Sequence, residues 1–563
     1  MRAKQHISIT KELVRVLIAV VLINIVGTYV YFRVDLTAEK RYTLKKTSKE
    51  ILRNLNDIVF VQVYLDGDMP AGLKKMQKEV RDQLNEYKIY AGTNLQYQFI
   101  NPHAIDNAES RNKLFRELSE RGLKPVNIQN KDSEGALSQK IIFPGAIVRY
   151  GDYELPVNLL KNSKNEGTYE NLQQSVEMIE YEFISAIYNL SSDSLRKIAF
   201  IEGHGEYDQY EVGDISRELS RFFQIDRGII DTLHCLDGYE AVIVAGPQRS
   251  FSEKEKLVLD QYIMQGGHVL WFVDGVIINE DSLAAGSTLV LPNDVNLGDM
   301  LFRYGLRINY NVVKDMHCNI IPVNTALPGT QAKFVPAPWV YHPLLVPPQQ
   351  ELITKGLDLV LSQYASQIDT LGGQQEIKKT VLLKSSAYAR TVNAPLFISL
   401  QEVAVAPDEK QYSMSNLPVA VLLEGSFNSA FTNRMLDNIV GKNAFVPLSR
   451  SKATSMLVVA DADIIRNSVR YTPRGPMISP LGYDRYTNQV FGNAQFIINT
   501  LHYMVTDPSL IELRAKKISI RLLDKAKVRN EKIYWQMLNT LAPIVIIIIT
   551  GIVIQLVRKK KYA

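Results

Sequence analysis

Three compact apolar runs, KIAFI, AVIVA and VLWFV, occupy Lys197–Ile201, Ala241–Ala245 and Val269–Val273. Each run has the length of one strand, and helical segments lie between them. The helix expected over Ser252–Met264 begins with a serine–glutamate capping box and is followed by two glycines. Apolar strands that alternate with helices predict a parallel sheet covered on both faces.

A fourth run, MLVVA at Met456–Ala460, precedes a helix expected from about Gly492 to Met504. We interpret this pair as a return to the same sheet, which makes the less regular, proline-rich region of about 292–450 an insertion. The predicted fold class is therefore α/β, with a parallel sheet in a domain over residues 191–510. The order of strand, helix, Gly-Gly and strand resembles a flavodoxin-like, class I glutamine amidotransferase-like sheet.

A smaller N-terminal α/β domain is expected over residues 33–190. Ile58–Leu65 and Leu95–Asn101 have the composition of strands, and between them apolar residues recur every three or four positions from Leu73 to Tyr87. This order predicts a β-α-β unit. Ala146–Val157 is predicted to form a hairpin that turns at Gly151.

Two further segments are long and apolar enough to cross a membrane. The first is Val16–Phe32, within a helix predicted at residues 13–32, and the second is Leu538–Val557. A cleaved signal peptide is the alternative for the first segment, but no small-residue cleavage site follows it. A basic connector helix at 511–537 leads into the second.

Basic residues flank the outer end of each predicted span. By the positive-inside rule they place the stub 1–12 and the tail 558–563 in the cytoplasm. The body between the spans then lies on the far side of the inner membrane, which is the periplasm in a Gram-negative cell. The sequence therefore predicts a two-anchor membrane protein with a large extracytoplasmic body.

Composition excludes several classes of protein. The 563 residues are 46% hydrophobic and carry a net charge of +5, which is typical of a globular protein and gives no reason to expect nucleic acid as a partner. The only cysteines are Cys235 and Cys318, too few for a zinc ribbon or an iron–sulfur site. They either pair in an oxidising compartment or remain separate thiols.

The motifs of common enzymes are missing from the sequence. It has no GxxxxGK[ST], HExxH, GxGxxG or GxSxG, so it lacks the phosphate loop with which a P-loop protein holds ATP. Amidotransferases of the class I fold place a cysteine nucleophile at a strand-to-helix turn, whereas the turn after Val273 here has Asp274-Gly275. We therefore expect neither catalytic residues nor a cofactor or metal.

Polar side chains follow the predicted strands at the edge where open α/β sheets bind ligands. They are His204, Glu206, Asp274, Asp461 and Asp463. If they converge, they can bind a ligand, hold a metal or act as acid and base. The favoured interpretation is structural, because aspartates commonly cap helices and glycines commonly form turns. Ligand binding comes second and catalysis third.

Several stretches in sequence order resemble the family of GldG, the auxiliary component of the gliding-motility ABC transporter of Bacteroidetes-type bacteria. The stretches that carry this resemblance are Phe32–Thr37 with Lys40–Leu44, Val63–Gly72, Ile201–Glu206, Leu259–Tyr262 with Gly266-Gly267, Pro338-Trp339 with His342–Leu344, Val421–Gly425 and Arg521–Lys525. The resemblance runs nearly end to end. It implies a GldA-like ATPase and a GldF-like permease as partners, a periplasmic body, and a role in gliding and the associated secretion.

Three functions follow, in order of preference. The first is a non-catalytic periplasmic subunit that couples a cytoplasmic ATPase and a permease to a partner in the cell envelope. The second is a solute- or glycan-binding module that uses the crevice near His204, Glu206 and Asp274. The third is a periplasmic hydrolase, for which the sequence provides no nucleophile.

Overall fold

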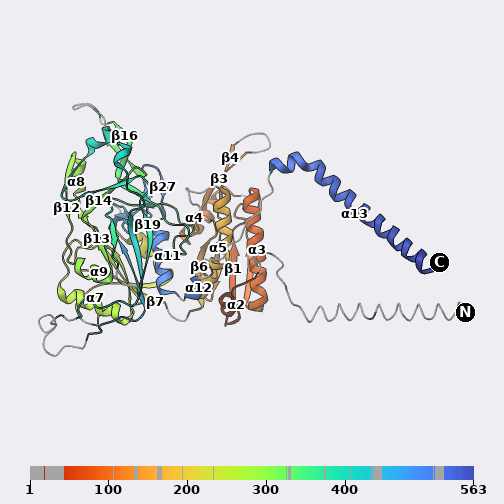
Figure 1. Cartoon of the computed structure of the whole chain (residues 1–563), viewed down its shortest axis with the longest axis horizontal. Coiled ribbons are helices and arrows are strands. Elements are labelled where there is room, and N and C mark those ends of the chain that lie inside the picture. Colours follow the sequence, from red (N-terminus) through yellow and green to blue (C-terminus); the bar gives the residue numbers. More distant parts are fainter. Residues whose placement is uncertain are drawn as a thin grey trace. The chain divides into compact units, whose positions relative to one another are not determined.

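The computed structural model shows a mixed α/β protein (Figure 1). It describes residue 18 and residues 43–562, except 106, 132–136, 161–167, 193–194, 233, 325, 327–330, 332, 373–375, 406, 433, 435–446, 474, 507, 512 and 514–524. The chain separates into two compact units, residues 1–516 and 517–563. The predicted first span at 13–32 lies, apart from Ile18, outside the described residues.

The first unit is built around a seven-stranded sheet in the order β19-β22-β23-β10-β9-β7-β8. Its strands are β7 (Arg196–Glu202), β8 (Phe223–Ile229), β9 (Ala241–Ala245), β10 (His268–Phe272), β19 (Ile377–Lys384), β22 (Pro418–Gly425) and β23 (Thr454–Val459). Neighbours from β23 through β10, β9 and β7 to β8 are parallel. The prediction that the four apolar runs share one parallel sheet is confirmed.

The sheet departs from the prediction at one edge. β22 is antiparallel to β23, and β19 is antiparallel to β22. Both strands come from the region interpreted as an irregular insertion, so part of that region extends the sheet. A strand that returns without a covering helix pairs antiparallel, and the sequence before β22 offers no amphipathic helix that would carry a parallel crossover.

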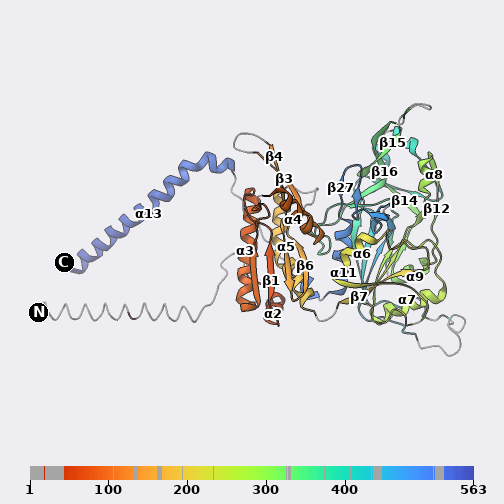
Figure 2. The same ribbon diagram turned by 180° about the vertical axis from the view of Figure 1, so that it is seen from behind.

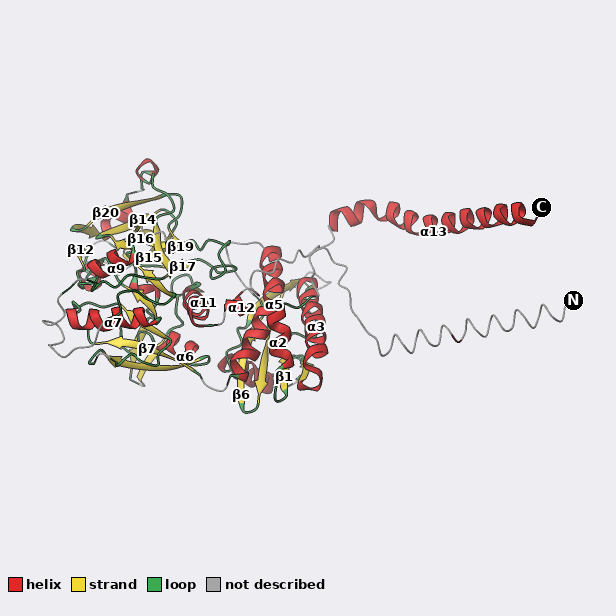
Figure 3. Ribbon diagram, turned by 60° about the horizontal axis from the view of Figure 1, so that its bottom comes forward, coloured by secondary structure: helices red, strands yellow, loops and turns green. Residues whose placement is uncertain are grey.

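Alternate residues of the central strands face two separate cores, which confirms the prediction of a sheet covered on both faces. Ile198 and Phe200 of β7 pack with α6 (Gly213–Leu219) and α11 (Asn493–Val505). Ala199 and Ile201 pack on the other face with α7 (Glu253–Gln265) and α9 (Gly298–Tyr304). Helices and strands are distinguished by colour in Figure 3.

Small sheets form over residues 276–399, a region that begins before the predicted start of the insertion at about 292. Most of them pack over a separate apolar cluster that includes the buried Trp339 and Tyr341, whereas Leu306 and Ile368 join the core of the seven-stranded sheet. The helix α8 (Glu280–Ala284) belongs to this region. The sheets are β11 (Val276–Ile277) with β12 (Ser287–Pro292) and β21 (Leu396–Ser399); β13 (Leu306–Ile308) with β18 (Ile368–Thr370); β14 (Asn311–Asp315) with β20 (Ala389–Asn393); and β15 (Cys318–Asn324) with β16 (Phe334–Leu345) and β17 (Val360–Leu361). Two short hairpins follow β23, β24 (Val469–Thr472) with β25 (Gly475–Ile478) and β26 (Tyr483–Asp484) with β27 (Gln489–Val490).

A second, four-stranded sheet lies towards the N-terminus, in the order β2-β1-β5-β6. Its strands are β1 (Val59–Val63), β2 (Leu95–Phe99), β5 (Gly145–Tyr150) and β6 (Tyr153–Asn158), with the hairpin β3 (Val126–Lys131) and β4 (Leu137–Ile142) beside them in sequence. β1 and β2 are parallel and joined through a helix, and β5 and β6 form a hairpin. The predicted β-α-β unit and hairpin are confirmed.

Four helices accompany this second sheet: α2 (Lys46–Arg53), α3 (Ala71–Ala91), α4 (Ala108–Glu120) and α5 (Thr168–Ser191). α3 and α5 lie side by side (Figures 1 and 2). The short α12 (Pro508–Ile511) contacts both α2 and α5. The N-terminal sheet is therefore tied to the segment that follows the seven-stranded sheet.

The second unit contains one long helix, α13 (Lys525–Tyr562). Within it, Glu531–Val557 is long and apolar enough to cross a membrane, and an 18-residue window of it has a mean hydropathy of 2.6. Among the described residues this is the one helix that meets both conditions. It contains the span predicted at 538–557.

Candidate functional site

The loop after β7 is fixed by hydrogen bonds. Gly203 and Gly205 have φ angles of 119° and 76°, in the region that favours glycine. The carbonyl oxygen of His204 accepts hydrogen bonds of 2.8 Å from the backbone N–H groups of Gln248 and Arg249. Because the loop after β7 is bonded to the loop after β9, His204 is held in one place.

Two carboxylates flank the imidazole of His204. Its Nδ1 lies 3.0 Å from Oε1 of Glu206, and its Nε2 lies 3.3 Å from Oε2 of Glu255 at the start of α7. The ring stacks on Phe251 with 3.7 Å between the ring centroids. Burial lowers the pKa of His204, but hydrogen bonds to the two glutamates outweigh burial, so its pKa lies above the ordinary value.

The three aspartates after β10 and β23 lie together. Oδ1 of Asp274 accepts a hydrogen bond of 2.7 Å from the N–H of Ala462. Asp461 accepts with Oδ1 from the N–H of Asp463 and with Oδ2 from the N–H of Gln363, both at 2.9 Å. These carboxylates therefore close the turn at the end of β23 and join it to the insertion.

Burial raises the pKa of all three carboxyl groups. For Asp274 burial and then the charge of Asp463 raise the pKa to about 7. Arg466 opposes the shift at Asp463, because its Nη1 lies 3.4 Å from Oδ1 of that residue. Tyr207 donates a hydrogen bond of 3.3 Å to the same oxygen. The cluster can therefore hold a proton near neutral pH.

The five residues predicted from the sequence form two groups instead of one. Within the described residues, no interaction joins His204 or Glu206 to Asp274, Asp461 or Asp463. No three His, Cys, Asp or Glu side chains in the described part of the chain are arranged to hold a metal ion. Cys235 and Cys318 are both free thiols, which resolves the alternative that the sequence left open.

A pocket of about 740 Å³ opens beside the aspartate cluster, at the carboxyl end of β10. Of the five predicted residues, only Asp274 lines it. The remaining lining comes from the two neighbours of Asp274, from the segment around α9, from the end of β13 through the start of β14, from β18 with the residue before it, and from the end of β20. No motif in the sequence signals this pocket, because its walls come from residues 273–311 and 367–394, two segments that only the folded chain brings together.

Gly275 is required where the pocket meets the sheet. A Cβ atom there would lie 2.6 Å from the carbonyl oxygen of Asn309 and 2.4 Å from Oγ of Ser366. Nδ2 of Asn293 donates to the carbonyl oxygen of Asp274 at 3.0 Å. The floor of the pocket is therefore packed tightly against the end of β10.

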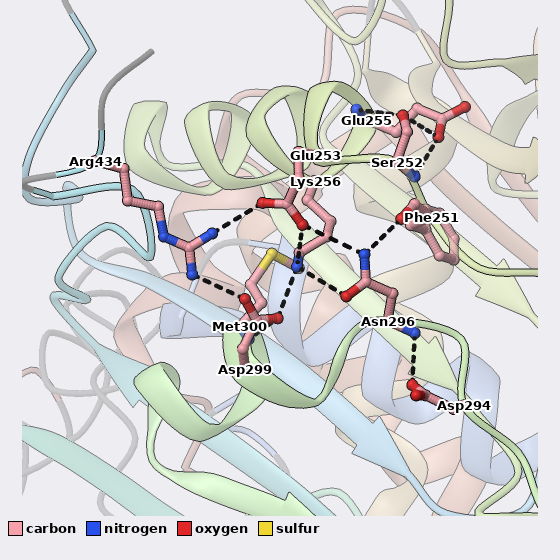
Figure 4. A network of polar contacts seen from close by, with 10 residues as sticks. All are labelled: Phe251, Ser252, Glu253, Glu255, Lys256, Asp294, Asn296, Asp299, Met300 and Arg434. Atoms are coloured by element: carbon pink, nitrogen blue, oxygen red, sulfur yellow. Dashed lines mark hydrogen bonds and ion pairs between the residues drawn. The ribbon is translucent and has the colours of Figure 1, made fainter. Parts of the chain in front are cut away.

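A polar network holds α9, which forms part of the pocket wall, against α7 (Figure 4). The ammonium group of Lys256 is buried, 2.9 Å from Oε1 of Glu253 and 2.7 Å from Oδ1 of Asp299. Arg434 contacts the second oxygen of each carboxylate, at 2.9 and 2.8 Å. Asn296 accepts a further bond of 3.4 Å from Lys256. Four charged groups thus join the two helices.

Two protein families match the chain. One is described as an ABC-type uncharacterized transport system, ABC_transp_aux, and matches residues 195–500. The other is described as a domain of unknown function and matches residues 38–149. The first match contains the whole seven-stranded sheet and the pocket, and the second contains most of the strands of the N-terminal sheet.

Solved structures give only distant similarities. The N-terminal domain of mmIFT52 has 13% sequence identity and a TM-score of 0.31, over 55% of this chain and 98% of that domain. The exo-beta-1,4-mannosidase Op5Man5 from Opitutaceae bacterium strain TAV5 has 11% identity and a TM-score of 0.21, over 78% of this chain and 49% of that enzyme. A search among curated proteins finds no match.

Proposed function

The chain belongs to the family of ABC-type uncharacterized transport systems, and we propose that it is a non-catalytic auxiliary subunit of such a system, of the gliding-motility GldG kind. The observation that carries this proposal is the family match over residues 195–500, joined in one chain to a helix able to cross a membrane. The family implies that other transporter components are partners.

The missing ATP-binding motif supports this division of labour. A chain without GxxxxGK[ST] has no P-loop with which to hold nucleotide phosphates, so a separate subunit must hydrolyse ATP. We propose a GldA-like ATPase for that role and a GldF-like permease in the membrane. The resemblance in sequence order to the GldG family supports these partners and a role in gliding and secretion.

We also propose that the protein has two anchors and a periplasmic body. α13 is one candidate anchor, and the apolar segment at 13–32 is the other. Basic residues at the outer ends of both segments support cytoplasmic termini at the inner membrane. Residues 33–190 and 191–510 would then be the two domains of the body, an assignment supported by their separate sheets.

The order of the parallel strands supports a flavodoxin-like domain. Along the sheet, β8, β7, β9, β10 and β23 follow the chain order 2-1-3-4-5, which is the order of flavodoxin-like sheets. The class I amidotransferase relationship remains part of the proposal, without its nucleophile. The turn after β10 has Asp274, and Cys235 lies between β8 and β9.

Affinity purification of the tagged chain from native membranes in mild detergent tests the proposed function. We expect mass spectrometry to identify an ATPase and a permease as stoichiometric partners. A matched tag on an unrelated protein with two membrane spans controls for carry-over. Recovery of the chain alone, stable and without transporter components, would contradict the proposal.

A second candidate function is supported by the pocket beside Asp274. We propose it as a solute-binding site within the same subunit. His204 and Glu206, which the sequence grouped with Asp274, do not line the pocket and are paired with each other. Alanine at Asp274 should therefore abolish solute binding, whereas alanine at His204 or Glu206 should affect stability.

A further inference from the structure

We propose that the pocket at the carboxyl end of β10 binds a neutral saccharide. The inference rests on the second candidate function, solute binding, and identifies the chemical class of the solute. A volume of about 740 Å³ lies within the range of roughly 300–1,000 Å³ that small-molecule sites occupy. The argument depends on the polar groups of the lining, on its charge and on its aromatic rings.

Side-chain amides dominate the polar lining. They belong to Asn293, Asn309, Asn311, Gln367 and Asn393. An amide provides both a donor and an acceptor, which matches the hydroxyl groups of a sugar, each of which also donates and accepts. Within the part of the chain that the structure describes, the side chains of Asn309 and Asn393 have no hydrogen-bond partner, so both remain able to bind a ligand.

The charge of the lining disfavours an anion. Among the described residues of the lining the one cation is Arg307, whose Nη2 lies 2.8 Å from Oδ2 of Asp369, so its charge is already compensated. Asp274 and Asp294 add two further acidic groups. Burial raises the pKa of Asp274 to about 7, which makes that group partly neutral and able to donate a hydrogen bond. Among the described residues that line the pocket, no cation is therefore free to bind a phosphate. Oδ1 of Asp294 already accepts a hydrogen bond of 3.1 Å from the N–H of Asn296.

Two aromatic rings border the same pocket. Phe302 is 56% exposed and Tyr310 is 44% exposed, so both rings are accessible to a ligand in the pocket. A sugar ring has an apolar face of C–H groups that packs on an aromatic ring, while its hydroxyl groups extend to the sides. The exposed rings of Phe302 and Tyr310 suit the apolar face of a sugar, and the amides of the lining suit its hydroxyl groups.

The pocket is largely preformed. Oδ1 of Asn311 accepts a hydrogen bond of 3.0 Å from the N–H of Gln367, and Oγ of Ser366 donates to the carbonyl oxygen of Asn311 at 2.7 Å. The ion pairs of Lys256 hold α9 against α7. A site with its walls held in this way loses little entropy when a ligand binds.

A neutral peptide is the strongest competing ligand. Peptides are commonly captured by main-chain hydrogen bonds along the free edge of a strand. The lining here offers side-chain amides from several separate segments, which suits hydroxyl groups arranged around a ring. Peptide binding is therefore an outcome that would overturn the inference.

The test measures binding by the full chain in lipid nanodiscs, because glycosidic detergents carry sugar head groups of their own. A neutral glycan array identifies the best probe, and isothermal titration calorimetry measures its affinity. We expect Phe302→Ala and Asn393→Ala each to weaken binding about tenfold. Phe397→Ala and Tyr388→Ala, on exposed aromatic residues outside the pocket, are matched controls that should bind normally.

A charge variant tests the pocket more sharply. The sulfated form of the same glycan should bind the natural chain at least tenfold more weakly than the neutral form. Asp369→Asn removes the partner of Arg307 and should reduce that difference, because the guanidinium becomes free to pair with sulfate.

Three results would overturn the inference: no ligand on the neutral array, tighter binding of a tri-alanine probe or of the sulfated form by the natural chain, or loss of binding in the control variants alone. The pocket variants should still co-purify with the ATPase and the permease. A chain that keeps these partners but binds no saccharide would refute this inference and leave the auxiliary-subunit proposal intact.

Discussion

Asp274, Asp461 and Asp463 bring three carboxyl groups into one buried cluster, and Arg466 forms an ion pair with Asp463. Asp274 and Asp461 accept hydrogen bonds from backbone N–H groups. The structural role that the sequence favoured stays a prediction. The sequence could predict that they follow strand ends. The sequence could not predict that these aspartates lie apart from His204. That separation depends on the direction in which each side chain points from its loop.

Asp274→Asn is expected to stabilise the protein above neutral pH. A raised pKa in the folded state means that the natural carboxyl contributes stability below about pH 3.9, its unfolded value, and loses that contribution as the pH rises through about 7. Asparagine keeps the oxygen that bonds Ala462 and never ionises. Urea unfolding should show a gain of about 1–3 kcal/mol at pH 8 that disappears near pH 4.

The control for this experiment is Asp152→Asn, in the exposed turn between β5 and β6. It should change stability little at either pH. A constant difference between Asp274→Asn and the natural chain from pH 4 to pH 8 would contradict the assignment, because it would show that the folded and unfolded states ionise together.

His204→Gln is expected to destabilise the protein most in mildly acidic solution. The raised pKa of His204 gives stability that is present below about pH 6.5 and is lost as the pH rises through the folded value. The lowered pKa of Glu255 gives stability that is present above about pH 4.3. Between these limits both partners are charged, and the loss should be about 1–3 kcal/mol.

Thermal unfolding at pH 6 and pH 8.5 measures this effect. His234→Gln is the matched control, because His234 is 3.1 Å from Asp237 but both side chains are largely exposed. An equal loss at both pH values in His204→Gln would show that the imidazole acts by packing on Phe251 and not through its charge.

At the scale of elements, α7 shows how much a local signal can predict. Its serine–glutamate capping box and its terminating glycine were evident in the sequence, and the structure has both at Ser252, Glu255 and Gly266. The places of β19 and β22 in the sheet were not evident, because each pairs antiparallel with its neighbour across a long connection and follows no regular crossover. Residues close in sequence determine a helix cap such as that of α7. The edge of the sheet depends instead on pairing between strands that are distant in sequence.

The ion pairs between α7 and α9 yield a prediction about buried charge. Glu253→Gln with Asp299→Asn leaves the ammonium group of Lys256 buried without a charged partner and should cost about 3–5 kcal/mol. Adding Lys256→Met to that pair removes the isolated charge, so the triple variant should recover much of the loss. Chemical unfolding of the natural chain and of the two variants measures the comparison.

A triple variant that is less stable than the double variant would show that Lys256 stabilises the helix pair through its aliphatic stem. Arg434→Gln separates the exposed part of the network from the buried part. Because this guanidinium is 37% exposed, its removal should cost no more than about 1 kcal/mol.

At the scale of the whole molecule, the two proposed anchors can be separated by truncation. Residues 517–563 form a compact unit of their own, so a chain that ends at residue 516 should keep its folded body. We expect that chain to remain in the membrane fraction through the segment at 13–32. Removal of residues 1–42 as well should release the body into solution, as measured by fractionation and circular dichroism.

Release of the body by the C-terminal truncation alone would show that α13 is the single anchor. The sequence could predict the membrane anchors because a spanning helix requires a long run of apolar residues, which is visible in the sequence itself. It was silent about the pocket, because Asn293, Asn309 and Asn393 are ordinary loop and strand residues until the insertion folds. The proposed solute site therefore depends on the topology of the chain and not on a sequence motif.

The position of β23 has a consequence for how the chain is made. β10 is buried on both faces, and its neighbour β23 is synthesised almost two hundred residues later, as the contact between His268 and Ser455 across 187 residues shows. Until then an apolar strand edge stays open, which invites pairing with another chain. Long-range pairing of this kind also folds slowly. A newly synthesised chain should therefore depend on a chaperone between the synthesis of β10 and that of β23. Early folding of the insertion would shorten that dependence by bringing the two strands together.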